Sequence, residues 1–166
     1  VGGGMAYGPA LFFILSPLVE RGDVGMKEFL AVEDLQNPGA WQAAIAELIA
    51  TFAFVFLGAG AVVTAVEVLG AGNLTAAGLL VIALAHGLAI ALLVAAVARF
   101  SGGHINPAVT IAAVVARKIG LTKGIMYVVA QLVGAAAGAF LLASVIPDAI
   151  QGTLGAHSLA DQIDAN

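Results

Sequence analysis

The chain has 166 residues, of which 61% are hydrophobic and only 10% charged, and its mean hydropathy is +1.07. This balance is too apolar for an ordinary soluble domain of this size, so a lipid bilayer is the expected solvent. The net charge is −4 with six scattered basic residues, which excludes a nucleic-acid-binding face, and the absence of cysteine excludes disulfide frameworks and thiolate metal sites. We therefore expect no metal ion and no cofactor.

The first forty residues are predicted to be an N-terminal extension and linker. Residues 5–19 are apolar, but the run is too short for a membrane span and contains two prolines, so we expect it to be interfacial or disordered. Residues 20–40 hold five acids, two bases and an Asn-Pro-Gly turn, which is typical of a hydrated linker. Met26 would make a natural start, so residues 1–25 are interpreted as an upstream extension.

Three later stretches are long and apolar enough to cross a bilayer, which takes about 20 helical residues. A fourth stretch, 106–116, has about half that length and can reach only the midplane. Residues 41–146 therefore form the membrane unit, and 147–166 form an external connection or severed loop. The predicted spans are 42–66, 76–98 and 125–146.

The basic residues predict the orientation, because Lys and Arg near span ends favour the cytoplasmic side. All of them precede the first span or lie between the second and third, whereas the loop 67–75 and the tail have none. The N-terminus should therefore be cytoplasmic and the C-terminus external. The six are Arg21, Lys27, Arg99, Arg117, Lys118 and Lys123.

The half-length stretch follows the segment Ser-Gly-Gly-His-Ile-Asn-Pro-Ala-Val-Thr, residues 101–110. A chain that enters and leaves the membrane on one side needs water or protein around its irregular backbone, so this segment predicts an aqueous path. Asn106 suits an N-cap and Pro107 the first helical position, and the Asn106 side-chain oxygen can accept the Val109 N–H. Its NH2 group is then a fixed donor, beside the partial positive charge of a helix N-terminus.

The backbone before Asn106 completes the predicted conduction site. Its carbonyl groups are not used by a helix and can form a ladder of acceptors that leads to the Asn106 donor. This chemistry suits a neutral dipole, although an ordinary helix cap is the alternative interpretation. The carbonyls are those of Gly102, Gly103, His104 and Ile105.

The segment 101–110 resembles the first Asn-Pro-Ala loop of the aquaporin, or major intrinsic protein, family. Other stretches are similar to that family in order and spacing over roughly 42–146: Ala46-Glu47 with Thr51 to Gly58, Ala85 to Ala89, and Tyr127 to Gly134. The resemblance implies an all-α membrane protein with three transmembrane helices plus one re-entrant half-helix, which is one repeat of the aquaporin fold.

The sequence departs from the family pattern in one respect. No second Asn-Pro-Ala loop appears, nor the filter arginine that follows it in the family. The resemblance implies that a second repeat is required for a complete pore, and that a full-length member forms a homotetramer. We therefore expect these residues to supply a half-pore.

The resemblance also implies roles for two polar residues inside the spans. Glu47 is expected to brace the re-entrant loop by hydrogen bonds to its backbone, with solute contact as the alternative. Gln131 is expected to make a structural hydrogen bond, again with solute contact as the alternative. His104 should anchor the loop through its side chain and lend its carbonyl to the pore.

Three further residues match family positions that face the pore. His86 belongs to the aromatic/arginine constriction, the alternative being a histidine satisfied between helices. Phe54 and Val109 match positions on the pore wall, but single apolar residues are equally well explained as core. These assignments complete the expected pore contacts.

The predicted function is passive conduction of water and small neutral solutes, with ammonia and urea as candidates and glycerol a weaker one, in the cell membrane. A non-conducting half-length protein that assembles with or regulates a full-length channel is the alternative. A coupled transporter is disfavoured because His86 is the only histidine or charged residue in the second and third spans. No enzyme activity is expected, because the tail residues His157, Ser158 and Asp161 have no fixed geometry.

Overall fold

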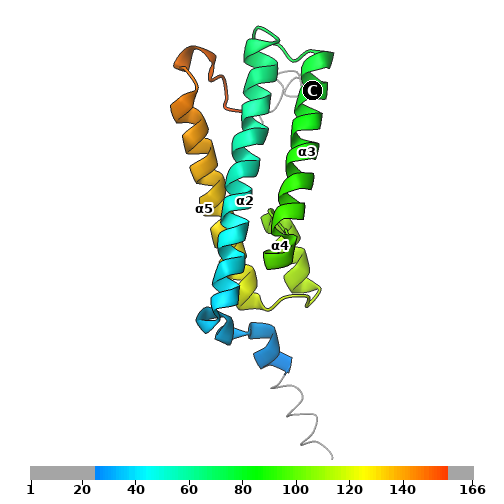
Figure 1. The fold of residues 1–166 in the computed structure, drawn as a ribbon, viewed down its shortest axis with the longest axis vertical. Coiled ribbons are helices and arrows are strands. Elements are labelled where there is room, and N and C mark those ends of the chain that lie inside the picture. Colours follow the sequence, from blue (N-terminus) through cyan, green and yellow to red (C-terminus); the bar gives the residue numbers. More distant parts are fainter. Residues whose placement is uncertain (1–24, 157–166) are drawn as a thin grey trace, which may run out of the picture.

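The computed structural model describes residues 25–156, and this part of the chain is helical and contains no β-strand. Three long helices lie side by side, with one short helix in the lower half of the bundle (Figure 1). The predicted fold class is confirmed. The elements, in chain order after a helical turn at 25–30, are η1 Val32–Gln36, α2 Pro38–Val63, the π-helical turn η2 Thr64–Val68, α3 Ala76–Ser101, α4 Pro107–Val115, α5 Leu121–Val145 and η3 Asp148–Ile150.

The long helices are each apolar enough to cross a membrane. The spans are Pro38–Val68, Ala76–Ser101 and Leu121–Val145, with mean hydropathies of 2.2, 2.7 and 2.0. They confirm the three predicted stretches: the first is longer at both ends, the second begins at the predicted residue and is longer at its C-terminal end, and the third begins earlier than predicted. Capping residues decide some of these boundaries. The Thr75 hydroxyl, for example, accepts the Gly78 N–H at 3.0 Å and so begins α3.

Two glycines let α5 lie directly against α2. A side-chain carbon on Gly134 would collide with the Leu48 carbonyl oxygen, and one on Gly138 would come within 2.5 Å of the Phe52 carbonyl oxygen. Small residues at this spacing permit close approach of helix backbones in membranes. The Gly-x-x-x-Gly motif therefore serves packing within the chain, and α2 becomes the central helix that both α3 and α5 contact.

The short helix α4 does not cross the bundle. Its nine residues span about 13 Å at about 1.5 Å per residue, less than half of the roughly 30 Å hydrocarbon core. It packs on α5, where Gly124 leaves room for Val114, and it ends at the level where α5 begins (Figure 1). The chain thus turns back after α3 and leaves by the end at which it arrived, as the re-entrant interpretation requires.

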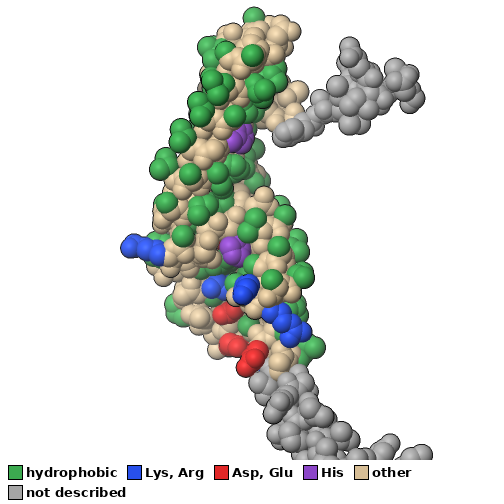
Figure 2. Space-filling view, turned by 90° about the vertical axis from the view of Figure 1, so that its right-hand side faces the viewer, with side chains coloured by type: hydrophobic (Ala, Val, Ile, Leu, Met, Phe, Trp, Pro, Cys, Tyr) green, Lys and Arg blue, Asp and Glu red, His purple; other side chains and the backbone are tan. Residues whose placement is uncertain are grey.

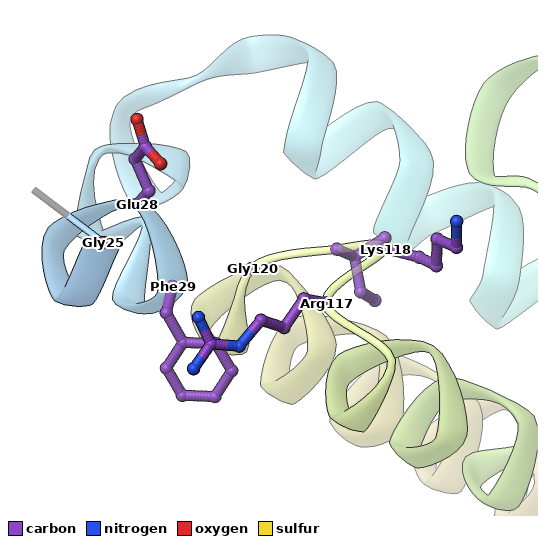
Figure 3. Close-up of a pocket in the computed structure, with 7 residues that line it drawn as sticks. Gly25, Glu28, Phe29, Arg117, Lys118 and Gly120 are labelled. Carbon is purple, nitrogen blue, oxygen red and sulfur yellow. The ribbon is translucent and has the colours of Figure 1, made fainter. Parts of the chain in front are cut away.

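Residues 25–36, predicted to be part of a hydrated linker, are mostly helical and mostly exposed, and they contact the segment between α4 and α5 and the start of α5. The Thr122 hydroxyl donates to the Leu30 carbonyl at 2.7 Å. The Arg117 guanidinium lies 5.5 Å from the centre of the Phe29 ring, and both side chains line a cavity of about 220 Å³ (Figure 3). These contacts connect residues 25–36 to the helical bundle; the run 5–19 lies outside the described residues.

Candidate pore site

Glu47 on α2 lies at the centre of the site, with none of its surface exposed. One carboxylate oxygen accepts the Ser101 hydroxyl at 2.6 Å and the His104 N–H at 2.9 Å. The other accepts the Ile105 N–H at 2.6 Å and the Gln131 side-chain amide at 2.8 Å. A carboxylate offers about four acceptor sites, so its capacity is filled. Glu47 thus joins α2, the re-entrant loop and α5, and makes the loop contacts that a bracing role needs.

Gln131 and Thr110 extend this network beneath the loop, and both are fully buried. The Gln131 amide nitrogen donates to the Thr110 hydroxyl oxygen at 3.0 Å as well as to Glu47. The Thr110 hydroxyl also lies 3.2 Å from the Asn106 carbonyl and 3.0 Å from Nδ1 of His104. Gln131 therefore makes its hydrogen bonds within the protein, with its amide turned inward.

Two contributors to this network had no expected role from the sequence. Thr110 ends the loop motif, and only its position on a half-length helix hinted at burial. Tyr127 is fully buried and donates its hydroxyl to the Ser101 carbonyl at 2.9 Å, where α3 ends. A buried tyrosine hydroxyl needs a partner, and that need is the one signal that could have pointed to it.

The loop backbone takes a conformation that ordinary residues avoid. Gly102, Gly103 and Ile105 have φ values of +92°, +68° and +51°. Glycine adopts this left-handed region freely, whereas a β-branched isoleucine is strained there. The Glu47 carboxylate compensates at that residue, because it accepts the Ile105 N–H. The backbone that is expected to supply the carbonyl ladder is therefore held in place by a buried charge.

The side chains of this region divide into buried and exposed groups. Ile105 is 3% exposed, and the His104 ring meets the Tyr127 ring edge-on at 5.3 Å, so both side chains are anchored in the protein. Val109 is instead 48% exposed on α4. Of the two apolar candidates, Val109 thus lies on an open surface, and Phe54 is half-buried on α2.

Asn106 stands at the exposed N-terminus of α4, with Pro107 in the first turn. Its side-chain oxygen accepts the Ala108 N–H at 2.8 Å, not that of Val109 as expected. The correction follows from its extended backbone, φ −153° and ψ 128°, which brings the side chain over the second helical N–H. The consequence for the amide is unchanged: the oxygen is engaged within the protein and the NH2 group is left to donate outward.

His86 on α3 lies near the other end of the bundle, beside α2. Its Nδ1 is 2.9 Å from the Ile82 carbonyl oxygen, and its ring meets the Phe54 ring edge-on at 5.8 Å. Both line a cavity of about 310 Å³ that Gly155 of the tail also borders. Because a carbonyl only accepts, Nδ1 carries a hydrogen, and in the tautomer with a single ring hydrogen Nε2 is then an acceptor. The cavity therefore has one polar wall group among apolar neighbours.

These features define an α-helical membrane protein in which a buried carboxylate holds a re-entrant loop and presents the N-terminus of a half-helix. The family model described as Major intrinsic protein matches residues 34–166. This chain belongs to the major intrinsic protein family, which confirms the resemblance inferred from its motifs.

Curated relatives agree with this assignment. The chain is 42% identical over 123 residues to probable aquaporin TIP1-1 of Oryza sativa subsp. japonica, covering 74% of this chain and 49% of the relative. It is 45% identical over 129 residues to the lens fiber major intrinsic protein of Ovis aries, covering 76% and 45%, and 40% identical over 136 residues to aquaporin-4 of Mus musculus, covering 82% and 41%. The chain thus spans about half the length of the relatives it matches.

Proposed function

We propose that this chain supplies half of the wall of a passive membrane channel for water and small neutral solutes. The observation that carries the proposal is the binding of two consecutive loop N–H groups, those of His104 and Ile105, by the buried Glu47 carboxylate. These two N–H groups are therefore hydrogen-bonded inside the protein and are not available to a solute. The loop carbonyls and the Asn106 amide then remain as the polar groups available to a solute.

The arrangement suits a neutral dipole better than an ion. A water molecule on the carbonyl ladder donates its hydrogens to the carbonyl oxygens. When it reaches Asn106, its oxygen can accept a hydrogen bond from the side-chain NH2 group. The N-terminus of α4 adds roughly half a positive charge at the same place, which disfavours cations. Passage of a neutral solute requires no titratable relay, and His86 is the one histidine within α2, α3 and α5.

The choice of solute is assigned to the cavity that contains His86. An unprotonated Nε2 can accept hydrogen bonds from the N–H groups of ammonia or urea as well as from water. Imidazole is also smaller than the side-chain rings of phenylalanine and tryptophan, so it leaves a wider and more polar passage. Water is therefore the first proposed solute, ammonia and urea follow, and glycerol is the weakest candidate.

The complete pore is proposed to need a second repeat, because the relatives are about twice as long as the matched region. Inverted repeats place a conduction path at their common interface. The exposed N-terminus of α4 would then face its counterpart at the midplane. We further propose that the N-terminus is cytoplasmic, that the protein resides in the cell membrane, and that the complete channel is a homotetramer, as the family resemblance implies.

The test compares the 166-residue chain in liposomes with the same chain joined to the second half of a matched relative. Stopped-flow light scattering should report little water permeability for the first and rapid permeation for the second. Slow permeation through both, at equal protein incorporation, would contradict the channel proposal and favour the non-conducting regulatory role. Rapid permeation through the chain alone would show that copies of one repeat suffice.

The chain offers a matched control for the role of Asn106. Asn37 is also an N-cap before a proline, and its side-chain oxygen accepts the Gly39 N–H at 2.9 Å, but it lies at the start of α2 away from the loop. Asp caps a helix about as well as Asn, so either Asn→Asp change should be mild for stability. Asn106→Asp should sharply reduce water flux in the joined channel, and Asn37→Asp should not; equal flux in both variants would identify Asn106 as a cap only.

A further inference from the structure

Gly58 on α2 occupies the position that the His86 ring overlies. A side-chain carbon on Gly58 would stand 2.7 Å from Nε2 of His86, and 3.2 and 3.3 Å from Cδ2 and Cε1. Real side-chain carbons essentially never approach a heavy atom to within 3.0 Å. The tip of the imidazole therefore fills the space that any other residue at position 58 would need.

The rest of the environment restricts where the ring can go. Nδ1 is tied to the Ile82 carbonyl at 2.9 Å, one turn earlier on the same helix. Phe54, one turn before Gly58 on α2, meets the ring edge-on at 5.8 Å. The ring is thus turned back against α2, and the free direction is the cavity that Phe54, Gly58 and His86 share.

We propose that Gly58 is a positioning residue for His86 and thereby sets the width of the solute-selecting passage. This inference rests on the proposed channel function and deepens it, because it names a residue that acts on the solute through the position of the His86 ring. The absent side chain lets the imidazole retract. Any side chain at 58 pushes the ring into the cavity, narrows it, and discriminates against solutes larger than water.

The flux test uses the joined channel with Gly58→Ala. One methyl group in a tight site changes discrimination by roughly 10-fold or more, so the urea-to-water permeability ratio should fall about tenfold. In a His86→Ala background the same change should alter the ratio less than about twofold, because the obstructed ring is gone. An equal effect in both backgrounds would show that Gly58 acts without His86.

A matched control lies one half-turn away on the same helix. A side-chain carbon on Gly60 would meet only the Cδ1 methyl of Leu142, at 3.3 Å, and a flexible side-chain end can move aside. Gly60→Ala should therefore leave the urea-to-water ratio unchanged while matching the change in helix propensity. A fall in the ratio equal to that of Gly58→Ala would indicate a general disturbance of α2 and overturn the inference.

A second readout does not depend on conduction. The chain has only three histidines, at positions 86, 104 and 157, so the His86 ring resonances can be assigned in detergent micelles by comparison with His86→Ala. Gly58→Ala should shift them and weaken the nuclear Overhauser contact to the Phe54 ring. Unchanged resonances would refute the positioning role, even in a conducting channel. If Gly58→Ala shifts the His86 resonances but the wild-type joined channel does not conduct, the positioning role stands and the proposed channel function is refuted.

Discussion

Replacing Glu47 with glutamine removes one acceptor from a site in which all acceptors are used. If the new NH2 group takes the place of the oxygen that binds Ile105 and Gln131, the Gln131 amide can rotate and accept, but the Ile105 N–H is left unpaired. If it takes the other place, the Ser101 hydroxyl can turn to the Val97 carbonyl, 3.4 Å away, but the His104 N–H is left unpaired. One loop N–H loses its partner in either arrangement.

The magnitude follows from this count. An unsatisfied buried donor costs about 1–3 kcal/mol, and hydrogen bonds to a charged acceptor exceed neutral ones by roughly 1 kcal/mol each. Relief from burying the charge offsets part of the loss. The net destabilisation of the loop should be about 2–4 kcal/mol, with about 3 kcal/mol corresponding to roughly 100-fold faster exchange of the loop amides.

Hydrogen exchange by mass spectrometry or NMR measures this directly at His104 and Ile105. Glu67→Gln is the control, because Glu67 lies in η2 at the far end of α2, away from the loop. Exchange at the two loop amides should accelerate in Glu47→Gln alone, and the joined channel should lose most of its water flux. Loop exchange within about threefold of wild type would refute the reasoning that the carboxylate holds the loop.

Three further outcomes are expected. Single cysteines introduced at Ala116 and Ala149 should be labelled from opposite sides of the membrane. Position 116 should be labelled from the cytoplasmic side, at the half of the molecule where the basic side chains gather (Figure 2). Labelling of both positions from one side would contradict the three-crossing topology. His86→Phe in the joined channel should retain water flux while ammonia and urea uptake fall, and unchanged solute ratios would remove His86 from the passage. Gly138→Ala should lower the free energy of unfolding by about 1–3 kcal/mol, because the added methyl group collides with the α2 backbone. Gly87→Ala should not, because the space beside Gly87 is open, and equal melting temperatures of the two variants would refute the packing argument.

The re-entrant geometry was predictable from the sequence because its signals are local. Hydrophobic length distinguishes a spanning helix from a half-length one, and Asn106 followed by Pro107 marks a helix start by chemistry confined to a few residues. The one local detail that was wrong, the partner of the Asn106 side chain, depends on backbone angles that residue types do not fix. The helical structure of residues 25–36 is less predictable, because contacts of Phe29 with Arg117 and of Leu30 with Thr122, both distant in the sequence, accompany it.

By itself, the sequence determined the solvent, the three spans, the half-helix and the cap at Asn106, because hydrophobic length and capping act over one helix at a time. The contact between Glu47 and the loop was expected only from the family resemblance; the tertiary structure decided which loop groups Glu47 binds, that Tyr127 secures the end of α3, and that the glycines of α5 serve contact with α2. Those contacts depend on which helix faces come together, and several faces are equally apolar in the sequence. The direction of the His86 ring likewise follows from the missing side chain at Gly58 on a neighbouring helix, a relation that no spacing along the chain reveals.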